Sequence, residues 1–436
     1  MTPKRTLKTD SAAAWGAAAL FAAVVSALKI QQVWRLQSQA WDLGIHANML
    51  WNTAHGRWFW DSIKGVNYLG DHFSPSLALL APLLRLWPDA SVLCVAQTLA
   101  LALGLPAVHR LTLEKTGDRT LAAGLTLLYA FSPLVHGVSR DDVHAVAFAV
   151  PLLLWGLILP GARGLALLAA AGTLQEDLWL CAAAAAWHRK ERVAAAAFVA
   201  AFLVSLLLLR AVGGGFKPLH WDFYRPAAIA ASLFRPDRLV GLARLLLPLG
   251  GLQLFGGADA LPLLAPLGYT WAGASPHQGR LELHYAAPLI PFAFLAAAAG
   301  LRRLKLKPWA FAALVLLGAF WLPRYSRPLT PEKTRAAAEL MALVPKDAPV
   351  IASFNLVPSL ALRPEIKMWR AGVDPAGYWI ALDAAPPYFE LEAGNDLQTD
   401  SAVREFITVR LDRVVYASEW LCLLRPRLKP DAVGSP

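Results

Sequence analysis

MTPKRTLKTDSAAAWGAAALFAAVVSALKI (residues 1–30) places Lys4, Arg5 and Lys8 before a long apolar run. The run has about the 20 residues that an α-helix needs to cross a bilayer. No clear small-residue cleavage site follows it, so we expect an uncleaved membrane span rather than a signal peptide. Because basic residues collect at the cytoplasmic ends of spans, the N-terminus is predicted to lie in the cytoplasm.

The composition of the whole chain has the same character. Of its 436 residues, 57% are hydrophobic and only 16% are charged, against about 25% charged residues in soluble proteins. The mean hydropathy is +0.44, and the 17 tryptophans suit a membrane–water interface. The net charge of +11 is split among short clusters between apolar runs, which argues against a nucleic-acid surface. We therefore predict an α-helical polytopic membrane protein.

Apolar runs separated by short polar loops continue through most of the chain. We expect about eleven membrane spans, at residues 12–30, 91–109, 120–136, 143–160, 163–175, 177–188, 192–212, 237–255, 259–272, 284–301 and 308–323. The loops assigned to the cytoplasm carry Arg110, Lys115, Arg119, Arg163, Arg189, Lys190, Arg192, Arg302, Arg303, Lys305 and Lys307. With the N-terminus inside and an odd number of spans, the C-terminus is predicted to lie outside.

Two domains follow from this pattern. Residues 1–323 are predicted to form the transmembrane domain, with an outer loop at 31–90 that carries interfacial helices. From residue 324 to 436, β-rich runs such as Pro349–Ala352 and Tyr378–Leu382 alternate with helical patterns. Such alternation is typical of a small α/β domain, which the span count places outside the cytoplasm.

Two apolar segments are unsuited to simple spans. The run SPSLALLAPLLRLW (74–87) is too short to cross a bilayer and contains Pro82 and Arg85, so we expect a half-embedded or interfacial helix. The segment GLALLAAAGTLQEDLWLCAAAAAW (164–187) holds Glu176 and Asp177 at its middle. It is predicted to form two short helices that meet at these acids.

Ionisable residues at membrane depth are functional candidates, because an uncompensated charge costs several kcal/mol there. The first candidate cluster is WDLGIHANMLWNTAHGRWFW (41–60). If 40–54 is an interfacial helix, Asp42 and His46 share one face of it, beside an apolar strip that includes Ile45 and Met49. Asp42 could act as a general base in a partly dry cleft. Alternatively, it pairs with a basic neighbour and has no catalytic role.

Three further polar clusters are assigned to the same outer side. NYLGDHFSP (67–75) holds Asp71 and His72, and SRDDVHA (139–145) holds Arg140, Asp141, Asp142 and His144. QGRLELHY (278–285) holds Arg280, His284 and Tyr285, and is grouped with Glu176 and Asp177. These residues suit a divalent cation such as Mg²⁺ or Mn²⁺, or a phosphate held by an arginine. Helix caps and solvated loops explain the same patterns without any ligand.

Several blocks of this sequence, in order, resemble a bacterial and archaeal family of predicted membrane proteins, domain of unknown function 2079. The blocks are WDLGIHANMLWNTAHGRWFW, GVNYLGDHFSPSLALLAPLLRLWP, DDVHAVAFAVPLLLW, LQEDLWL, LELHYAAPLIPFAFLAAAAGL and VPKDAPVIASFNLVPSLALRPEIKMW. The layout is also similar, more distantly, to that of GT-C glycosyltransferases. That likeness implies an enzyme in which a sugar passes from a polyprenyl-phosphate donor to an acceptor on the outer face of the membrane.

The GT-C resemblance also implies roles for particular residues. Asp42 corresponds to the acid of the first outer loop, which takes the acceptor proton in an inverting transfer of a hexose or pentose. His72 and Pro75 stand at a basic–proline junction, and Asp141 or Asp142 corresponds to a second acid. The residues expected to border the cavity or hold the leaving phosphate are Lys64, His72, Glu176, Asp177 and Arg280.

The sequence departs from the family pattern at three places. His46, Ala47 and Asn48 stand where an aromatic residue, Asp and Gln are more usual. Ala145 and Val146 replace a proline and an acid, and Gln175 replaces a lysine.

Other functions use the same features. A flippase or transporter of a lipid-linked substrate would use buried acids for proton or ion coupling, although no internal repeat is visible and the polar clusters lie toward one face. A membrane scaffold whose outer domain binds a partner protein is a further alternative. In every case we expect a multi-pass protein of a prokaryotic plasma (inner) membrane.

Overall fold

The computed structural model describes residues 6–214, 219–304, 306–370, 373–384 and 400–426. The chain divides into two compact units. The helical unit comprises Met1–Ala27, Leu69–Leu77 and Cys94–Arg324. The second unit comprises Leu28–Tyr68, Ala78–Leu93 and Tyr325–Pro436, so it joins much of the loop after the first span to the C-terminal segment.

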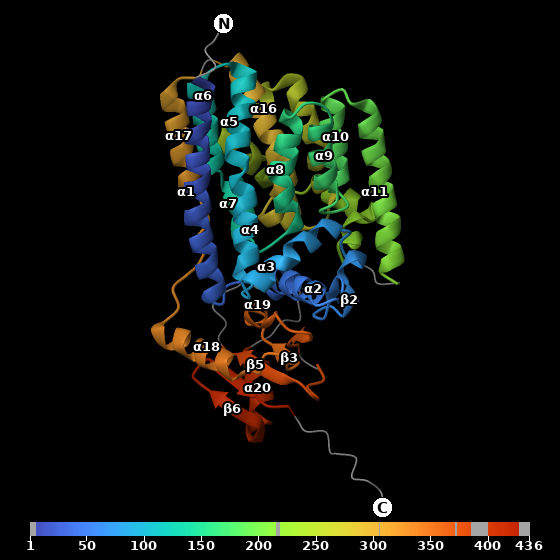
Figure 1. The fold of residues 1–436 in the computed structure, drawn as a ribbon, viewed down its shortest axis with the longest axis vertical. Helices are drawn as coiled ribbons and strands as arrows, with labels where there is room; N and C mark the ends of the chain where they lie inside the picture. Colours follow the sequence, from blue (N-terminus) through green and yellow to red (C-terminus); the bar gives the residue numbers. More distant parts are fainter. Residues whose placement is uncertain (1–5, 215–218, 305, 371–372, 385–399, 427–436) are drawn as a thin grey trace, which may run out of the picture. The chain divides into compact units, whose positions relative to one another are not determined.

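The helical unit consists mainly of α-helices that run along a shared direction (Figure 1). The α-helices are α1 (Thr6–Trp34), α4 (Ser91–Ala102), α5 (Gly104–Thr116), α6 (Arg119–Ala130), α7 (Pro133–Arg140), α8 (Ala145–Ile158), α9 (Gly161–Gly172), α10 (Leu178–His188), α11 (Arg192–Val212), α12 (Pro226–Ser232), α13 (Asp237–Leu246), α14 (Leu264–Ala272), α15 (Pro276–Gly279), α16 (Ile290–Arg303) and α17 (Pro308–Phe320). Helix α16 is central: it packs against α5, α6 and α8, and residues 290–301 are all buried.

Ten of the described helical segments are apolar enough to be compared with the predicted spans. Five have the length and composition of a membrane-crossing helix: Ala12–Trp34, Ser91–Thr116, Arg119–Arg140, Arg192–Val212 and Leu283–Arg303. Five shorter apolar helices are Pro75–Leu86, Ala145–Ile158, Gly161–Gly172, Leu178–His188 and Trp309–Phe320. The two helices predicted to meet at Glu176 and Asp177 are α9 and α10, and these acids lie in the bend between them.

The predicted spans 237–255 and 259–272 are wrong as regular helices. The segment forms α13, the 3-10 helices η5 (Leu247–Leu249), η6 (Leu252–Phe255) and η7 (Gly257–Leu263), and then α14. Gly250, Gly251 and Gly257 have positive φ angles of 58°, 69° and 60°, which a right-handed helix cannot contain. Prolines in η5 and η7 also remove backbone donors.

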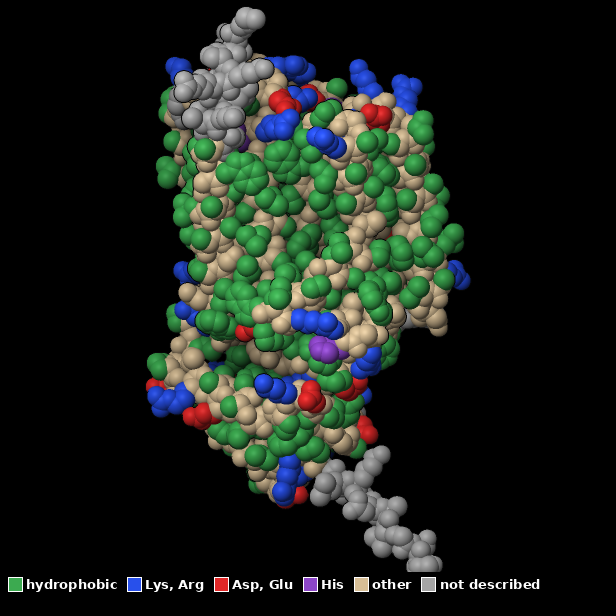
Figure 2. Space-filling view, viewed as in Figure 1, with side chains coloured by type: hydrophobic (Ala, Val, Ile, Leu, Met, Phe, Trp, Pro, Cys, Tyr) green, Lys and Arg blue, Asp and Glu red, His purple; other side chains and the backbone are tan. Residues whose placement is uncertain are grey.

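The surface of the helical unit is divided by charge. Figure 2 shows Lys and Arg side chains gathered at the end from which α1 starts, and a mainly hydrophobic visible face below them. Lys115 and Arg119 flank the turn between α5 and α6, and Arg189 and Lys190 lie in the turn between α10 and α11. This separation is typical of a protein whose hydrophobic belt faces lipid.

The second unit contains a five-stranded mixed sheet in the order β4-β3-β5-β7-β6. The strands are β3 (Val350–Ala352), β4 (Ile366–Met368), β5 (Trp379–Asp383), β6 (Val414–Ala417) and β7 (Leu421–Leu424). Strand β3 pairs in parallel with β4 and β5, and β7 pairs antiparallel with β5 and β6. Strands β3 and β5 lie where the sequence predicted β-rich runs, within one residue at each end.

Both faces of this sheet are covered. Successive residues of β3 point to opposite faces, and all three are buried. Val350 and Ala352 join a core with α18 (Pro331–Leu343), whereas Ile351 faces a second core with α20 (Asp400–Thr408). Two short helices, α19 (Val357–Leu360) and η9 (Leu411–Arg413), complete this part. Leu36 and Ala40 from the loop after the first span belong to the α18-side core.

The outer-loop helix expected at 40–54 is present, and its first five residues have π-helical geometry. Residues Ala40–Gly44 form a π-helix, η1, and Ile45–Ala54 form α2. Ile45 and Met49 are buried as expected, but His46, Asn48 and Asn52 are buried too. Burial is therefore not confined to the apolar face, because α2 is enclosed on its polar side as well. The interfacial position of this helix stays a prediction. A short hairpin of β1 (Trp60–Asp61) and β2 (Val66–Asn67) follows.

Candidate active site

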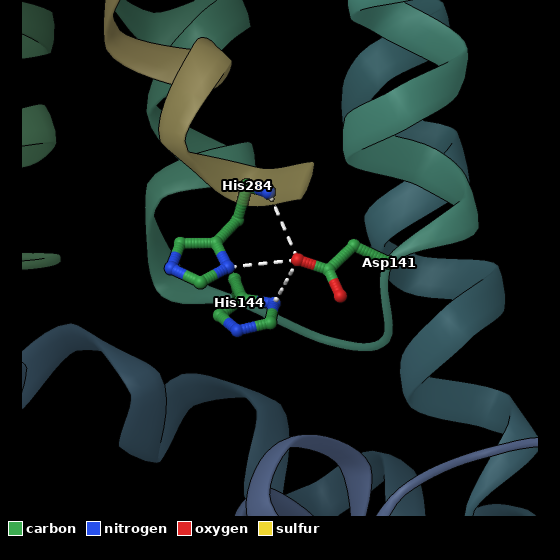
Figure 3. Close-up of side chains that lie close together, drawn as sticks. All are labelled: Asp141, His144 and His284. Carbon is green, nitrogen blue, oxygen red and sulfur yellow. Dashed lines mark hydrogen bonds and ion pairs between the residues drawn. The ribbon is translucent and has the colours of Figure 1, made fainter. Parts of the chain in front are cut away.

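Three predicted site residues of the helical unit converge on one another. Asp141 follows the last residue of α7, His144 precedes the first residue of α8, and His284 lies in the 3-10 helix η8 (Leu283–Leu289). Because η8 packs against both α7 and α8, residues distant in sequence meet here. Figure 3 shows the two imidazoles facing the same carboxylate.

The Oδ2 atom of Asp141 is the centre of this cluster. It lies 2.7 Å from Nδ1 of His284 and accepts a 2.9 Å hydrogen bond from the backbone N–H of the same residue. Nδ1 of His144 lies 3.7 Å from it. The two imidazole rings are stacked, with centroids 3.6 Å apart and an interplanar angle of 15°.

A glutamine fixes the linker between α7 and α8. Gln97, on α4, is 1% exposed; its Nε2 donates to the carbonyl oxygen of Asp142 at 3.0 Å, and its Oε1 accepts from the backbone N–H of His144 at 2.8 Å. One side chain thus satisfies two backbone groups of the linker and holds its neighbours in place. Sequence reasoning missed Gln97, although a lone polar residue within an apolar span is a signal that could have identified it.

The electrostatics of Asp141 follow from this arrangement. Burial by itself would raise its pKa, but the charge of His144 and then the hydrogen bonds and charge of His284 outweigh it. The net effect lowers the pKa of Asp141, so its carboxylate stays ionised at neutral pH.

A second pair lies in the helical unit. Nδ1 of His72 is 3.0 Å from Oε1 of Glu176, and Oε2 of Glu176 accepts a 2.9 Å hydrogen bond from the backbone N–H of Phe73. The hydroxyls of Ser76 and Thr173 are 2.6 Å apart. The acid at the α9–α10 bend therefore anchors the segment around His72.

The other predicted residues of the helical unit are dispersed. Asp71 and Asp142 are buried, and Asp177 is half-buried beside Glu176 at the start of α10. The ring of Tyr285 lies 4.1 Å from that of His284. Arg140 and Arg280 are exposed; the carboxylate of Glu282 near Arg280 is instead bound by Arg244 at 2.6 Å and His277 at 2.7 Å.

Asp42, His46 and Lys64 belong to the second unit. Asp42 is half-buried in η1, and Lys64 is half-buried in the β1–β2 turn. His46 lies between the backbone of Asp42 and the hydroxyl of Tyr68, at 2.8 Å and 3.0 Å. Sequence reasoning did not identify Tyr68 as a partner of this histidine.

The fold defines the class of protein: it is a multi-pass membrane protein with the GT-C fold. The structure of ArnT from Cupriavidus metallidurans bound to undecaprenyl phosphate is similar over 93% of this chain and 97% of that one, with a TM-score of 0.59 and 12% sequence identity. The apo structure of the same ArnT is similar over 94% and 98%, with a TM-score of 0.54 and 12% identity.

The chain belongs to the DUF2079 family of predicted membrane proteins, whose model matches residues 32–175 and 191–404. The family resemblance noted in the sequence is thereby confirmed, as is the more distant resemblance of its fold to GT-C enzymes. No curated protein matches the chain in sequence.

Proposed function

We propose that this chain is a membrane glycosyltransferase that moves a hexose or pentose from a polyprenyl-phosphate donor to an acceptor on the outer face of a prokaryotic plasma membrane. The observation that carries the proposal is the likeness of nearly the whole chain to ArnT, which was crystallised with undecaprenyl phosphate. The likeness covers 93% of this chain and 97% of that one.

Asp42 is our candidate for the general base. Its position in a π-helix supports this role, because π-turns are frequent at functional sites, and its half-buried carboxylate suits proton transfer. In the proposed step, an acceptor oxygen attacks the anomeric carbon and its proton passes to Asp42. The bond between that carbon and the phosphate oxygen breaks, and the polyprenyl phosphate leaves with inversion.

The departing phosphate requires positive charge or hydrogen-bond donors nearby. We assign Lys64, His72 and Arg280 as candidates, of which Arg280 is the most exposed and His72 is held by Glu176. The cluster of Asp141, His144 and His284 would maintain the shape of the helical unit.

The orientation is part of the proposal. The basic side chains at the α1 end of the helical unit support a cytoplasmic N-terminus. The C-terminal sheet would then lie outside the cytoplasm. A reporter fusion at each terminus, read for cytoplasmic or external activity, tests this arrangement directly.

The function is tested with purified full-length protein in lipid nanodiscs. Polyprenyl phosphates carrying radiolabelled hexoses or pentoses are supplied as donors, and transfer to envelope glycan or lipid acceptors is measured. We expect wild-type transfer with at least one donor and a fall of about 100-fold or more in Asp42→Asn. The matched control is Asp412→Asn, which changes an exposed acid in η9 and should leave the rate unchanged.

Two results would overturn the proposal. Equal rates for Asp42→Asn and wild type would remove Asp42 as the base. Movement of an intact lipid-linked sugar across the bilayer, with no new glycosidic bond, would instead establish a flippase.

A further inference from the structure

We infer that Asp141, His144 and His284 bind a transition-metal cation, with Zn²⁺ as the best match. The inference concerns a site in the helical unit and does not depend on the proposed glycosyl transfer. It rests on the positions of the three side chains, on the identity of their donor atoms and on the contacts that hold them.

The spacing of the donor atoms is close to that of a metal site. One donor atom from each of the three residues lies within 4.8 Å of the other two. The separations from Oδ2 of Asp141 to Nδ1 of His284 and of His144 are 2.7 Å and 3.7 Å. In a tetrahedral Zn²⁺ site with bonds of about 2.0 to 2.1 Å, ligand atoms are about 3.3 Å apart. Both separations therefore need to change by well under about 1 Å for the three atoms to surround one ion.

Both histidines present the same ring nitrogen to Asp141. Figure 3 shows the Nδ1 atoms of both histidines on the side of the ring that faces Asp141. The two rings are stacked, with 3.6 Å between centroids and 15° between their planes. Because an imidazole binds a metal in the plane of its ring, one of the two rings must rotate before both nitrogens meet the same ion. A single ion between them and the carboxylate would meet one donor from each side chain.

The kind of donor selects the kind of metal. Two imidazole nitrogens and one carboxylate oxygen are ligands that Zn²⁺ and other later first-row metals prefer. Mg²⁺ prefers oxygen ligands and retains several waters, so this cluster is a poor match for it. Among the described residues, neither Asp71 nor His72 belongs to the cluster; the ligand set differs from the Mg²⁺ or Mn²⁺ arrangement that the sequence suggested. Three protein ligands leave a tetrahedral ion with one open position.

Hydrogen bonds to the backbone hold two of the three ligands in place. The backbone N–H of His284 donates to Asp141 at 2.9 Å, and Gln97 accepts from the backbone N–H of His144 at 2.8 Å. The ligands come from the end of α7, the start of α8 and η8. A bound ion would link these three elements, so its binding free energy would add to the stability of the helical unit.

The test uses the full-length protein purified in detergent, stripped with a chelator and dialysed against Zn²⁺. Bound metal is measured by mass spectrometry, and affinity by competition with a chromogenic chelator. We expect about one equivalent of Zn²⁺ and a higher midpoint of thermal unfolding when it is bound. Co²⁺ in its place should give the visible absorption of a tetrahedral nitrogen–oxygen site.

The variants are His144→Gln and His284→Gln, with His277→Gln as the control. His277 also lies beside a carboxylate, at 2.7 Å from Glu282, but among the described residues it belongs to no group of three possible metal ligands. We expect each ligand variant to weaken Zn²⁺ binding by about 100-fold or more and to lose the metal-dependent thermal shift, whereas His277→Gln keeps both. Size-exclusion chromatography shows whether a variant is folded, and Asp141→Asn replaces any that is not.

Two outcomes would overturn the inference. One is a wild-type protein that takes up no Zn²⁺ or Co²⁺ after loading. The other is a folded ligand variant that binds the metal as tightly as the wild type, because the ion would then be held elsewhere.

Discussion

The Nδ1 atom of His46 lies 2.8 Å from the backbone carbonyl oxygen of Asp42. A carbonyl oxygen only accepts, so this nitrogen carries the hydrogen. In the neutral imidazole, Nε2 is then the acceptor for the hydroxyl of Tyr68, 3.0 Å away. His46 therefore connects η1, which carries Asp42, to Tyr68, the residue that follows β2. In this contact His46 meets the backbone oxygen of Asp42 and not its carboxylate.

This connection predicts coupled effects on stability. Tyr68→Phe should lower the free energy of unfolding by about 1 kcal/mol and His46→Ala by about 2 kcal/mol, because both side chains are buried. The double variant should lose less than the sum, since the two changes remove one shared hydrogen bond. Denaturant titration in detergent measures all three. The control is Tyr416→Phe, because Tyr416 is only half-buried and its hydroxyl donates to Glu339 at 2.9 Å in an exposed hydrogen bond. Strict additivity would show that the bond contributes nothing.

Asn48 links α2 to the C-terminal segment within the second unit. Its Nδ2 donates to the carbonyl oxygens of Ala361 and Arg363 at 3.0 Å and 2.9 Å, and its Oδ1 accepts from Ser62 at 2.9 Å. Asn48→Leu has a similar volume but leaves these buried groups without partners. We expect a loss of about 3 kcal/mol in the free energy of unfolding, measured by denaturant titration.

The control for Asn48 is Asn67→Leu. Asn67 is only half-buried and donates to the carbonyl oxygen of Trp58 at 3.3 Å in an exposed hydrogen bond, so its replacement should change stability by less than about 0.5 kcal/mol. Equal losses for the two variants would mean that the buried hydrogen bonds of Asn48 contribute no more to stability than the exposed hydrogen bond of Asn67. Limited proteolysis of the C-terminal segment gives an independent measurement.

The sequence predicted secondary structure best where a long apolar run indicates a single kind of element. Apolar runs located α1, α4 to α11, α16 and α17, because a long apolar helix needs no tertiary partner to be recognised. The same runs failed at 237–272, where glycines with positive φ and the prolines of η5 and η7 impose turns that hydropathy does not record. Short β-rich runs located β3 and β5, but not the order of the sheet.

The site was predictable in its residue types and not in its pairings. Asp141 and His144 are three residues apart, so their proximity could be expected, whereas His284 reaches them only because η8 packs on α7 and α8. The role of Asn48 was hidden for a related reason: its partners at 361 and 363 are backbone carbonyls, which leave no mark in a pattern of side chains.

Close contact between α5 and α6 gives a prediction within the helical unit. A Cβ on Gly104 would collide with the hydroxyl of Tyr129, which is buried and donates to the carbonyl oxygen of Leu101 at 2.9 Å. Gly104→Ala should therefore lower the thermal unfolding midpoint in detergent, despite the better helix propensity of alanine. Gly16→Ala is the matched control, because no atom lies within 4 Å of its Cβ position, and it should leave the midpoint equal or higher.

The contacts of Glu176 give a prediction for both stability and donor binding. One carboxylate holds both His72 and the backbone N–H of Phe73, and an amide has only one accepting oxygen to offer. Glu176→Gln should lower the free energy of unfolding by about 1 to 2 kcal/mol. Under the proposed function it should also raise the KM for the lipid donor several-fold, through the displaced His72. Glu114→Gln breaks an exposed ion pair with Arg110, whose side chains are 48% and 47% exposed, and should change neither quantity measurably. If both variants behave like the wild type, the segment around His72 is held by other contacts.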